Sequence, residues 1–165
     1  MRNVKITKLT LESFAPYGTT ANYLGYNEVV QSGMAFFPDL ARQSLGTETI
    51  VSYSVCVCAA CEYKIHTAEN HDHTDELIMP LDGDALFYVA PATLDNSFPA
   101  DRVEVFHIPK GTMILLKPGV WHYAPFAYGC EKVAVLCALP QRTYKNDCYM
   151  VHLEPDQQVF IQLES

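Results

Sequence analysis

The sequence predicts an all-β fold, in the form of a small barrel or sandwich built as one domain. Short segments rich in Val, Ile, Tyr and Phe are separated by turn residues, which is typical of strands. No helical segments alternate with them, so antiparallel sheets are favoured. The length of 165 residues is enough for one hydrophobic core. The predicted strands are 48–58, 62–67, 76–81, 84–90, 103–108, 112–117, 121–126, 131–138 and 157–163.

The first part of the chain lacks this strand pattern. We therefore expect residues 1–46 to form an irregular N-terminal arm and residues 47–165 to form the barrel, both within a single domain. In the arm, the sequence TLESFAPYG predicts one helical turn with Thr10 as its N-cap. The sequence PDLARQSLG, residues 38–46, predicts a second short helix.

Composition and charge exclude several classes of partner. Hydrophobic residues make up 49% of the chain and charged residues 18%, which is a globular composition. The net charge of −8 and the absence of a Lys/Arg block argue against nucleic acid as a partner. The longest apolar run, residues 133–139, is far shorter than the ~20 residues of a membrane helix. The basic N-terminus is not followed by the apolar region of a signal peptide, so a cytoplasmic location is predicted.

The six cysteines are expected to be reduced thiols, because no signal peptide is evident. Cys56, Cys58 and Cys61 lie close together, but a structural zinc site usually needs a second such group of ligands. The strand around them alternates, with small residues on one face. The small face holds Ser52, Ser54, Cys56 and Cys58, and the other holds Val51, Tyr53, Val55 and Val57. Small buried strand residues are therefore the preferred interpretation.

The sequence ENHDHTDE, residues 69–76, contains the candidate site. On a strand, His71 and His73 point to the same face about 7 Å apart, where two imidazoles can converge on one metal ion. Glu69 shares that face and can serve as a general base. Glu76 has the wrong parity and joins the histidines only if the intervening residues bend the strand.

A third nitrogen ligand has to come from elsewhere in the chain. His122 is the best candidate, because it begins a new strand after the turn at Pro118 and Gly119. A site of His and Glu ligands suits one divalent ion, and Zn²⁺, Mn²⁺, Fe²⁺ and Ni²⁺ all remain possible. Lys117 and Arg142 are the natural cations to bind a substrate carboxylate.

Two longer motifs include these residues. The segment HDHTDELIMPLDG resembles the first motif of the cupin superfamily, HxH…E(x)6G, and GTMILLKPGVWH resembles the second, G(x)5PxGxxH. The resemblance implies a double-stranded β-helix, or jelly-roll, barrel with metal ligands at His71, His73, Glu76 and His122. The gap between His73 and Glu76 is one residue shorter than in the motif, and Lys117 stands where the motif has its first proline.

Most of the chain also resembles the ureidoglycolate lyase family, a cupin branch of purine breakdown that splits ureidoglycolate into glyoxylate and urea. The matching segments are LTLESFAPYG, IHTAENHDHTDELIMPLDGDALFYVAPA, GVWHYAPFA and a late R…NDC that runs from Arg142 to Cys148. The lyases generally lack a histidine at the position of His73 and usually carry Gln in place of Glu76. At these positions the chain looks more like an ordinary metal cupin than its most similar family does.

Three functions are compatible with these observations. The leading hypothesis is a metal-dependent enzyme acting on a small, oxygen-rich, anionic metabolite, with the lyase reaction on ureidoglycolate first. A cupin isomerase or epimerase of sugars or keto acids is the second, because the HxH…E set is complete. A non-catalytic domain that binds a small molecule is the third. Cupins commonly pair through edge strands, so the apolar sequence QVFIQL, residues 158–163, predicts a homodimer contact.

Overall fold

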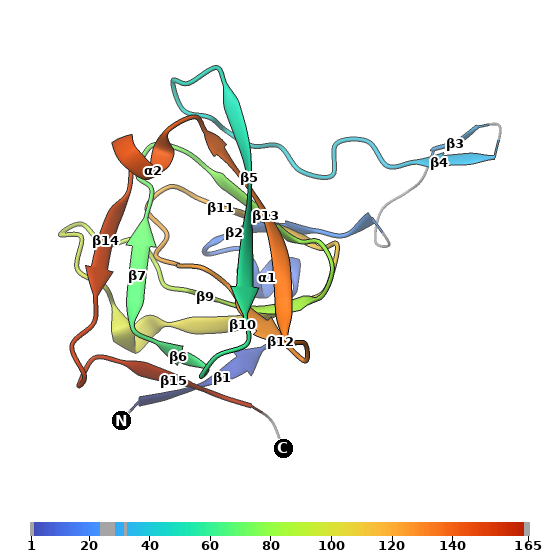
Figure 1. The fold of residues 1–165 in the computed structure, drawn as a ribbon. Coiled ribbons are helices and arrows are strands. Elements are labelled where there is room, and N and C mark those ends of the chain that lie inside the picture. The colour runs from blue at the N-terminus through green and yellow to red at the C-terminus, as the bar shows by residue number, and fades with distance from the viewer. Residues whose placement is uncertain (1, 24–28, 32, 164–165) are drawn as a thin grey trace.

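The computed structural model describes residues 2–23, 29–31 and 33–163 of the chain, which fold into a barrel (Figure 1). The helices are α1 (Leu11–Phe14), α2 (Thr143–Asn146) and the short 3-10 helix η2 (Ala100–Arg102). The strands are β1 (Arg2–Thr7), β2 (Gly18–Ala21), β3 (Val29–Gln31), β4 (Met34–Phe36), β5 (Val51–Ala59), β6 (Lys64–Ile65), β7 (Thr67–Asn70), β8 (Glu76–Pro80), β9 (Asp84–Val89), β10 (Glu104–Ile108), β11 (Met113–Leu116), β12 (Phe126–Tyr128), β13 (Lys132–Pro140), β14 (Tyr149–His152) and β15 (Val159–Gln162).

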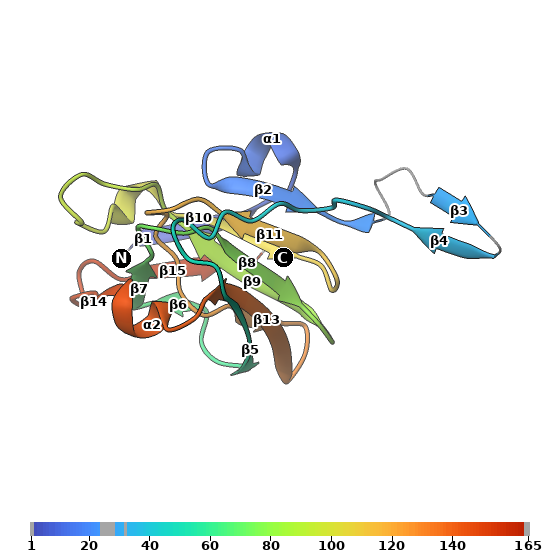
Figure 2. The ribbon, with the colours of Figure 1, turned by 90° about the horizontal axis from the view of Figure 1, so that it is seen from above.

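Two large sheets form the barrel wall. The first has six strands in the order β12-β9-β10-β1-β15-β6, and the second has five in the order β2-β11-β8-β13-β5. β7 and β14 pair with each other at one side of the barrel, and the β3–β4 hairpin projects away from it (Figures 1 and 2). This architecture confirms the all-β prediction. Most neighbouring strands are antiparallel, but β1 runs parallel to both β10 and β15.

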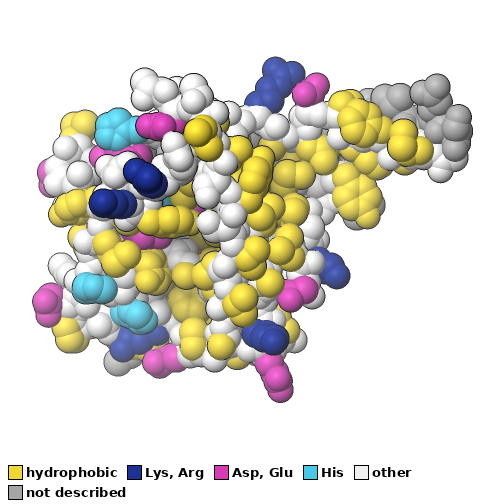
Figure 3. Space-filling view, turned by 45° about the horizontal axis from the view of Figure 1, so that its top comes forward, with side chains coloured by type: hydrophobic (Ala, Val, Ile, Leu, Met, Phe, Trp, Pro, Cys, Tyr) yellow, Lys and Arg dark blue, Asp and Glu magenta, His cyan; other side chains and the backbone are white. Residues whose placement is uncertain are grey.

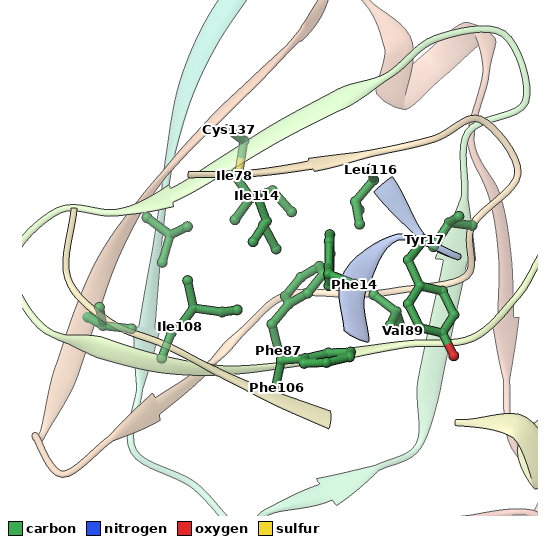
Figure 4. Close-up of a cluster of buried hydrophobic side chains, with 14 of the residues drawn as sticks. Phe14, Tyr17, Ile78, Phe87, Val89, Phe106, Ile108, Ile114, Leu116 and Cys137 are labelled. Carbon is green, nitrogen blue, oxygen red and sulfur yellow. The ribbon is translucent and has the colours of Figure 1, made fainter. Parts of the chain in front are cut away.

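The larger cluster of buried side chains draws on both sheets and on α1 (Figure 4). Phe14 of α1 is fully buried, and its ring meets that of Phe106 edge-on with the centroids 5.2 Å apart. Tyr17 joins the same group, and its hydroxyl donates a hydrogen bond to Glu104. The short helix is therefore fixed to the barrel by aromatic packing.

The predicted helical turn is confirmed, with Thr10 as its N-cap. The Thr10 hydroxyl accepts a hydrogen bond from the backbone of Ser13, whose hydroxyl in turn accepts from the backbone of Thr10. The second predicted helix was wrong, because residues 38–46 contain only turns and extended chain. The backbone N–H of Ser44 donates to the Asp75 carboxylate, and its carbonyl accepts from the Thr74 hydroxyl and the Asp75 N–H instead of from a helical partner.

Two further expectations need correction. Residues 2–21 were expected to be irregular apart from one turn, but they supply β1 and β2 to the two sheets. Val4 and Ile6 alternate with the exposed Asn3 and Lys5, a strand pattern that is too short and polar to stand out. The C-terminal strand β15 is not an edge strand, because it lies between β1 and β6. The sequence QVFIQL therefore offers no free edge for a dimer.

The predicted strand 121–126 is also different in the structure. Residues 121 and 122 form only isolated bridges, and the strand itself, β12, begins at Phe126. Trp121 pairs with Ala90 on one side, and His122 pairs with Glu69. Among the described residues, none of the helices has the length and apolar character needed to cross a membrane.

Gly18 is a position where the close approach of β2 and β11 can be tested. A Cβ added there would lie 1.8 Å from the carbonyl oxygen of Leu115, so the backbone of β2 would have to move. We expect Gly18→Ala to lower the free energy of unfolding by roughly 2 kcal/mol or more, measured by urea unfolding. Gly111→Ala is the control, because that residue has a φ of +75° but open space around it, and only strain of about 1 kcal/mol is expected. Equal losses in the two variants would contradict the role of the contact.

Candidate metal centre

The first two residues of the site come from segments that are distant in the sequence. Glu69, near the end of β7, forms an antiparallel bridge with His122. The backbone N–H of Glu69 donates to the carbonyl of His122 at 2.7 Å, and the N–H of His122 donates back at 2.9 Å. The predicted pairing of the first motif with His122 is therefore built directly into the backbone.

A bend at residues 71–75 carries the other two residues into the site. The side chain of Asp147, just after α2, holds this bend by accepting hydrogen bonds from the backbone N–H groups of Asp72 and His73, both at 3.0 Å. β8 begins directly after the bend with Glu76. The bend therefore reverses the parity that would otherwise point the Glu76 carboxylate away from the histidines.

Both buried histidines are held in the same tautomer. The Nδ1 of His71 lies 2.6 Å from the carbonyl oxygen of Asp147, and the Nδ1 of His122 lies 2.9 Å from that of Val120. A carbonyl oxygen only accepts, so each Nδ1 must carry the hydrogen. Each Nε2 is then left with a lone pair, which is the arrangement that metal-binding histidines normally have.

The carboxylate of Glu76 faces both of these lone pairs. Its Oε2 lies 2.7 Å from Nε2 of His122 and 3.6 Å from Nε2 of His71. All three residues are at most 5% exposed. These three atoms are close together but lack hydrogen-bond partners with proper geometry within the described chain. Buried polar atoms without partners usually mark a place for a ligand or an ion.

Within the described ranges, the negative charge of the site is not balanced by a basic side chain, because no ion pair joins Lys or Arg to Glu69 or Glu76. Burial works against protonation of His122, but the nearby Glu76 carboxylate prevails and raises the pKa of the imidazole. The site thus attracts positive charge, which either a proton or a metal ion can supply.

The side chains present fit a divalent metal ion. The ligand atoms of Glu69, His71 and His122 all lie within 4.8 Å of one another, and Glu76 contacts both histidines. Two imidazole nitrogens and the Glu76 carboxylate are ligands that Zn²⁺, Mn²⁺, Fe²⁺ and Ni²⁺ accept, and the Glu69 carboxylate lies beside them. The negative charges of Glu69 and Glu76 would together match the charge of the ion.

His73 does not lie at the site. Its side chain is 83% exposed, and its Nδ1 is 2.8 Å from the carboxylate of Asp147, which raises the pKa of the imidazole. The expected convergence with His71 requires a strand that continues through both residues. β7 ends at Asn70, so the rule of alternating faces no longer applies.

Glu69 has a thiol as its neighbour. The Sγ of Cys148 lies 3.3 Å from Oε2 of Glu69 and donates to it. Burial, followed by this hydrogen bond, raises the pKa of the Cys148 thiol to about 12. Cys148 is therefore protonated near neutral pH and serves to orient the carboxylate, not to attack a substrate.

Tyr144 is a site residue that the sequence did not single out. Its ring lies edge-on to that of His71, with centroids 6.2 Å apart. Partial burial, and then the charge of Glu76, raise the pKa of its hydroxyl, which stays neutral and able to donate. The matching segment R…NDC spans Tyr144 and Asp147 and was the signal that could have identified both.

The two cations expected to bind a substrate have different positions. The Nζ of Lys117 donates to the carbonyl of Ala15 at 2.6 Å, which places it at the C-terminal end of α1 and not with the site residues. Arg142 is exposed, and it precedes α2 and Tyr144 in a left-handed conformation with a φ of 63°. Only Arg142 therefore lies on a segment that borders the site.

Solved structures similar to the chain include two sugar isomerases and an oxalate decarboxylase. A dTDP sugar isomerase from Desulfovibrio desulfuricans G20 has a TM-score of 0.52 and 12% identity, over 86% of this chain and 89% of that one. A 3,4-ketoisomerase from Thermoanaerobacterium thermosaccharolyticum has a TM-score of 0.41 and 13% identity, over 79% and 85%. The oxalate decarboxylase of Bacillus subtilis has a TM-score of 0.45 and 14% identity, over 79% of this chain and 31% of that one. At such identities the isomerase shows the fold alone.

Sequence comparison identifies the family. None of the curated protein sequences matches the chain. The model of the ureidoglycolate lyase family, in contrast, matches residues 1–160, which include both motifs, α2 and all the site residues described above. The chain therefore belongs to the ureidoglycolate lyase family.

Proposed function

We propose that the protein is a metal-dependent lyase that splits ureidoglycolate into glyoxylate and urea. The observation that carries the proposal is the buried group of His71, Glu76 and His122, whose facing nitrogen and oxygen atoms lack hydrogen-bond partners. The family match over residues 1–160 supports this substrate. The reaction needs a site that polarises a hydroxyl and moves one proton, and the residues present are suited to both tasks.

The roles of the ligands follow from their geometry. His71 and His122 would hold the ion through Nε2, because each Nδ1 is bound to a backbone carbonyl. Glu76 would supply a carboxylate oxygen beside them. A divalent ion at this position supplies Lewis acidity, which makes a substrate hydroxyl easier to deprotonate.

Glu69 is the proposed general base. Its Oε2 accepts the Cys148 thiol hydrogen, so the other carboxylate oxygen remains to accept the proton of the substrate hydroxyl. Loss of that proton forms the carbonyl of glyoxylate while the C–N bond breaks. The proton then passes to the departing nitrogen to give urea, so the reaction consumes and releases no net proton at this step.

The alternative functions have lost specific support. The isomerase hypothesis depended on a complete HxH…E ligand set, and His73 is exposed and bound to Asp147. A binding domain without catalytic activity requires no general base, yet Glu69 lies within reach of both buried histidines.

For the location, we keep the cytoplasm as the proposal, which the free state of the cysteines supports. They are Cys56, Cys58, Cys61, Cys130, Cys137 and Cys148.

The metal site can be tested by binding alone. Chelator-treated protein is expected to bind about one equivalent of Mn²⁺ or Zn²⁺ by calorimetry. His71→Ala and His122→Ala should each weaken that binding by more than ~100-fold, because losing a residue that only hydrogen-bonds to a ligand often lowers metal affinity by about 10–100-fold. His73→Ala is the matched control and should bind within a few-fold of the wild type. Unchanged affinity in His71→Ala and His122→Ala would rule out the proposed centre.

The role of Glu69 can be separated from metal binding. Glu69→Gln keeps the size of the side chain but removes its basicity, so kcat for release of glyoxylate and urea should fall by about 10²–10⁴-fold. Its metal affinity should stay close to that of the wild type. Glu62→Gln, at an exposed residue before β6, is the control and should be fully active. Loss of metal affinity in Glu69→Gln would make this residue a ligand instead of the base.

The substrate carboxylate provides a test of the two cations. Arg142→Ala should raise the KM for ureidoglycolate by roughly 10-fold or more, the effect of losing one hydrogen bond to a charged group. Lys117→Ala should leave KM unchanged, because Lys117 is bound to Ala15. Steady-state kinetics of both variants decide the matter, and a raised KM in Lys117→Ala alone would reverse the assignment.

A further inference from the structure

Two cysteines of β5 lie close together on the inner side of the strand. Cys56 and Cys58 are two positions apart, and both pack against the buried core. Their Sγ atoms are 3.6 Å apart, and both residues are free thiols. Neither residue belongs to the metal centre described above. The thiol pair is therefore a second group of potential ligands, of a different chemical kind.

The thiol pair borders an open cavity. Residues 56–59 line a cavity of about 270 Å³, which residues 64–67 and 123–126 also line. Two exposed residues, Cys61 and His66, lie on the same cavity, whereas Cys56 and Cys58 are half-buried. Figure 3 shows the side of the molecule on which β5 lies, with hydrophobic side chains over much of this face. A small ion can therefore reach the two thiols from solvent and find further donors beside them.

The spacing of the two sulfurs suits a shared ion better than a disulfide. Two thiolates on a tetrahedral ion with a metal–sulfur distance of ~2.3 Å lie about 3.8 Å apart, close to the 3.6 Å found here. Alternate residues of a strand have Cα atoms about 6.6 Å apart, near the upper limit for a disulfide. Both cysteines are also held in the ladder with β13, where Cys56 pairs with Val135 and Cys58 with Val133. An ion can join the sulfurs without moving this backbone.

The type of ligand selects a soft cation. Thiolates favour Cu⁺ and Zn²⁺, whereas carboxylates suit harder ions such as Mn²⁺. Among the described residues that line the cavity, none carries a carboxylate side chain. Zn²⁺ normally takes four ligands in a closed tetrahedral site, and the contact in place here joins two. Cu⁺ is satisfied by two or three thiolates, so Cys61 alone can complete its coordination.

Binding has to displace the thiol protons. Burial, followed by the neighbouring Cys56, raises the pKa of the Cys58 thiol to about 12, so this sulfur is protonated and unreactive when no ion is bound. A cation that binds both sulfurs releases two protons, and its affinity is therefore expected to rise by about 100-fold per pH unit. This requirement favours a strongly thiophilic ion over a weakly bound one.

We propose that Cys56 and Cys58, with Cys61 as a third ligand, form a second metal site that binds one Cu⁺ ion. The site differs in kind from the buried centre of histidines and carboxylates, whose nitrogen and oxygen ligands suit divalent ions. The two sites therefore separate metals by the softness of their ligands. The inference does not depend on the lyase reaction.

Competition with bicinchoninate, a chelator that is coloured when it holds Cu⁺, tests this proposal. The reduced, metal-free full chain should remove about one equivalent of Cu⁺ from the chelator under anaerobic conditions. The double variant C56S/C58S should lose affinity by about 100-fold or more, because hydroxyls replace both soft ligands. Cys130→Ser and Cys148→Ser are the matched controls. Both are half-buried thiols outside the lining of this cavity, and both variants should bind within a few-fold of the wild type.

Several results would overturn the proposal. No uptake of Cu⁺ by the wild type, or equal uptake by C56S/C58S, would remove the site, and tighter binding of Zn²⁺ than of Cu⁺ at these cysteines would assign it to zinc. A further measurement uses the unmodified protein, in case the variant fails to fold. Bound Cu⁺ should protect Cys56 and Cys58, but not Cys130, from alkylation mapped by peptide mass spectrometry. Equal alkylation of the pair with and without the ion would contradict the assignment.

Discussion

Enclosed carboxylate charge is the constraint on which the rest of this barrel site depends. Glu76 is buried beside two imidazoles, with no Lys or Arg paired to it in the described chain. A buried carboxylate without a positive partner is strongly disfavoured, so the folded state needs either a proton on a histidine or a metal ion. The raised pKa of His122 means that the proton and the ion compete. Ion binding is therefore expected to weaken as the pH falls through that raised pKa and the imidazole becomes protonated.

The geometry of the site, which suits either a protonated histidine or a metal ion, depends largely on Asp147. Asp147 fixes the tautomer of His71 through its backbone carbonyl, and it fixes the bend before Glu76 through its carboxylate. Burial opposes ionisation of this carboxylate, but its hydrogen bonds, first with His73, keep its pKa below the ordinary value. His73 thus contributes to the site as a partner of Asp147 and not as a ligand.

The sequence predicted those parts of the site that depend on local pattern. His71, Glu76 and His122 followed from motif spacing and from the need for a bend, and the structure brings all three together. His73 was misplaced because its position depended on whether β7 continued beyond Asn70. A contact with Asp147, more than seventy positions away, decides that point. Tyr144 was missed because its contact with His71 also joins residues that are distant in the sequence. The short helix that brings the two together has no periodic signal in the sequence.

The chain that follows the β3–β4 hairpin also contacts the site. After the β3–β4 hairpin, the chain returns across the bend at residues 71–75, where Gln43 donates to the carbonyl of Asp75 at 3.0 Å. The backbone N–H of Ser44 donates to the carboxylate of Asp75, and the N–H of Asp75 donates back to the carbonyl of Ser44. Asp75 directly precedes Glu76, so the chain that follows the hairpin supports the bend that positions this carboxylate. The N-terminal part of the chain therefore contributes to the metal centre through backbone contacts and not through a ligand.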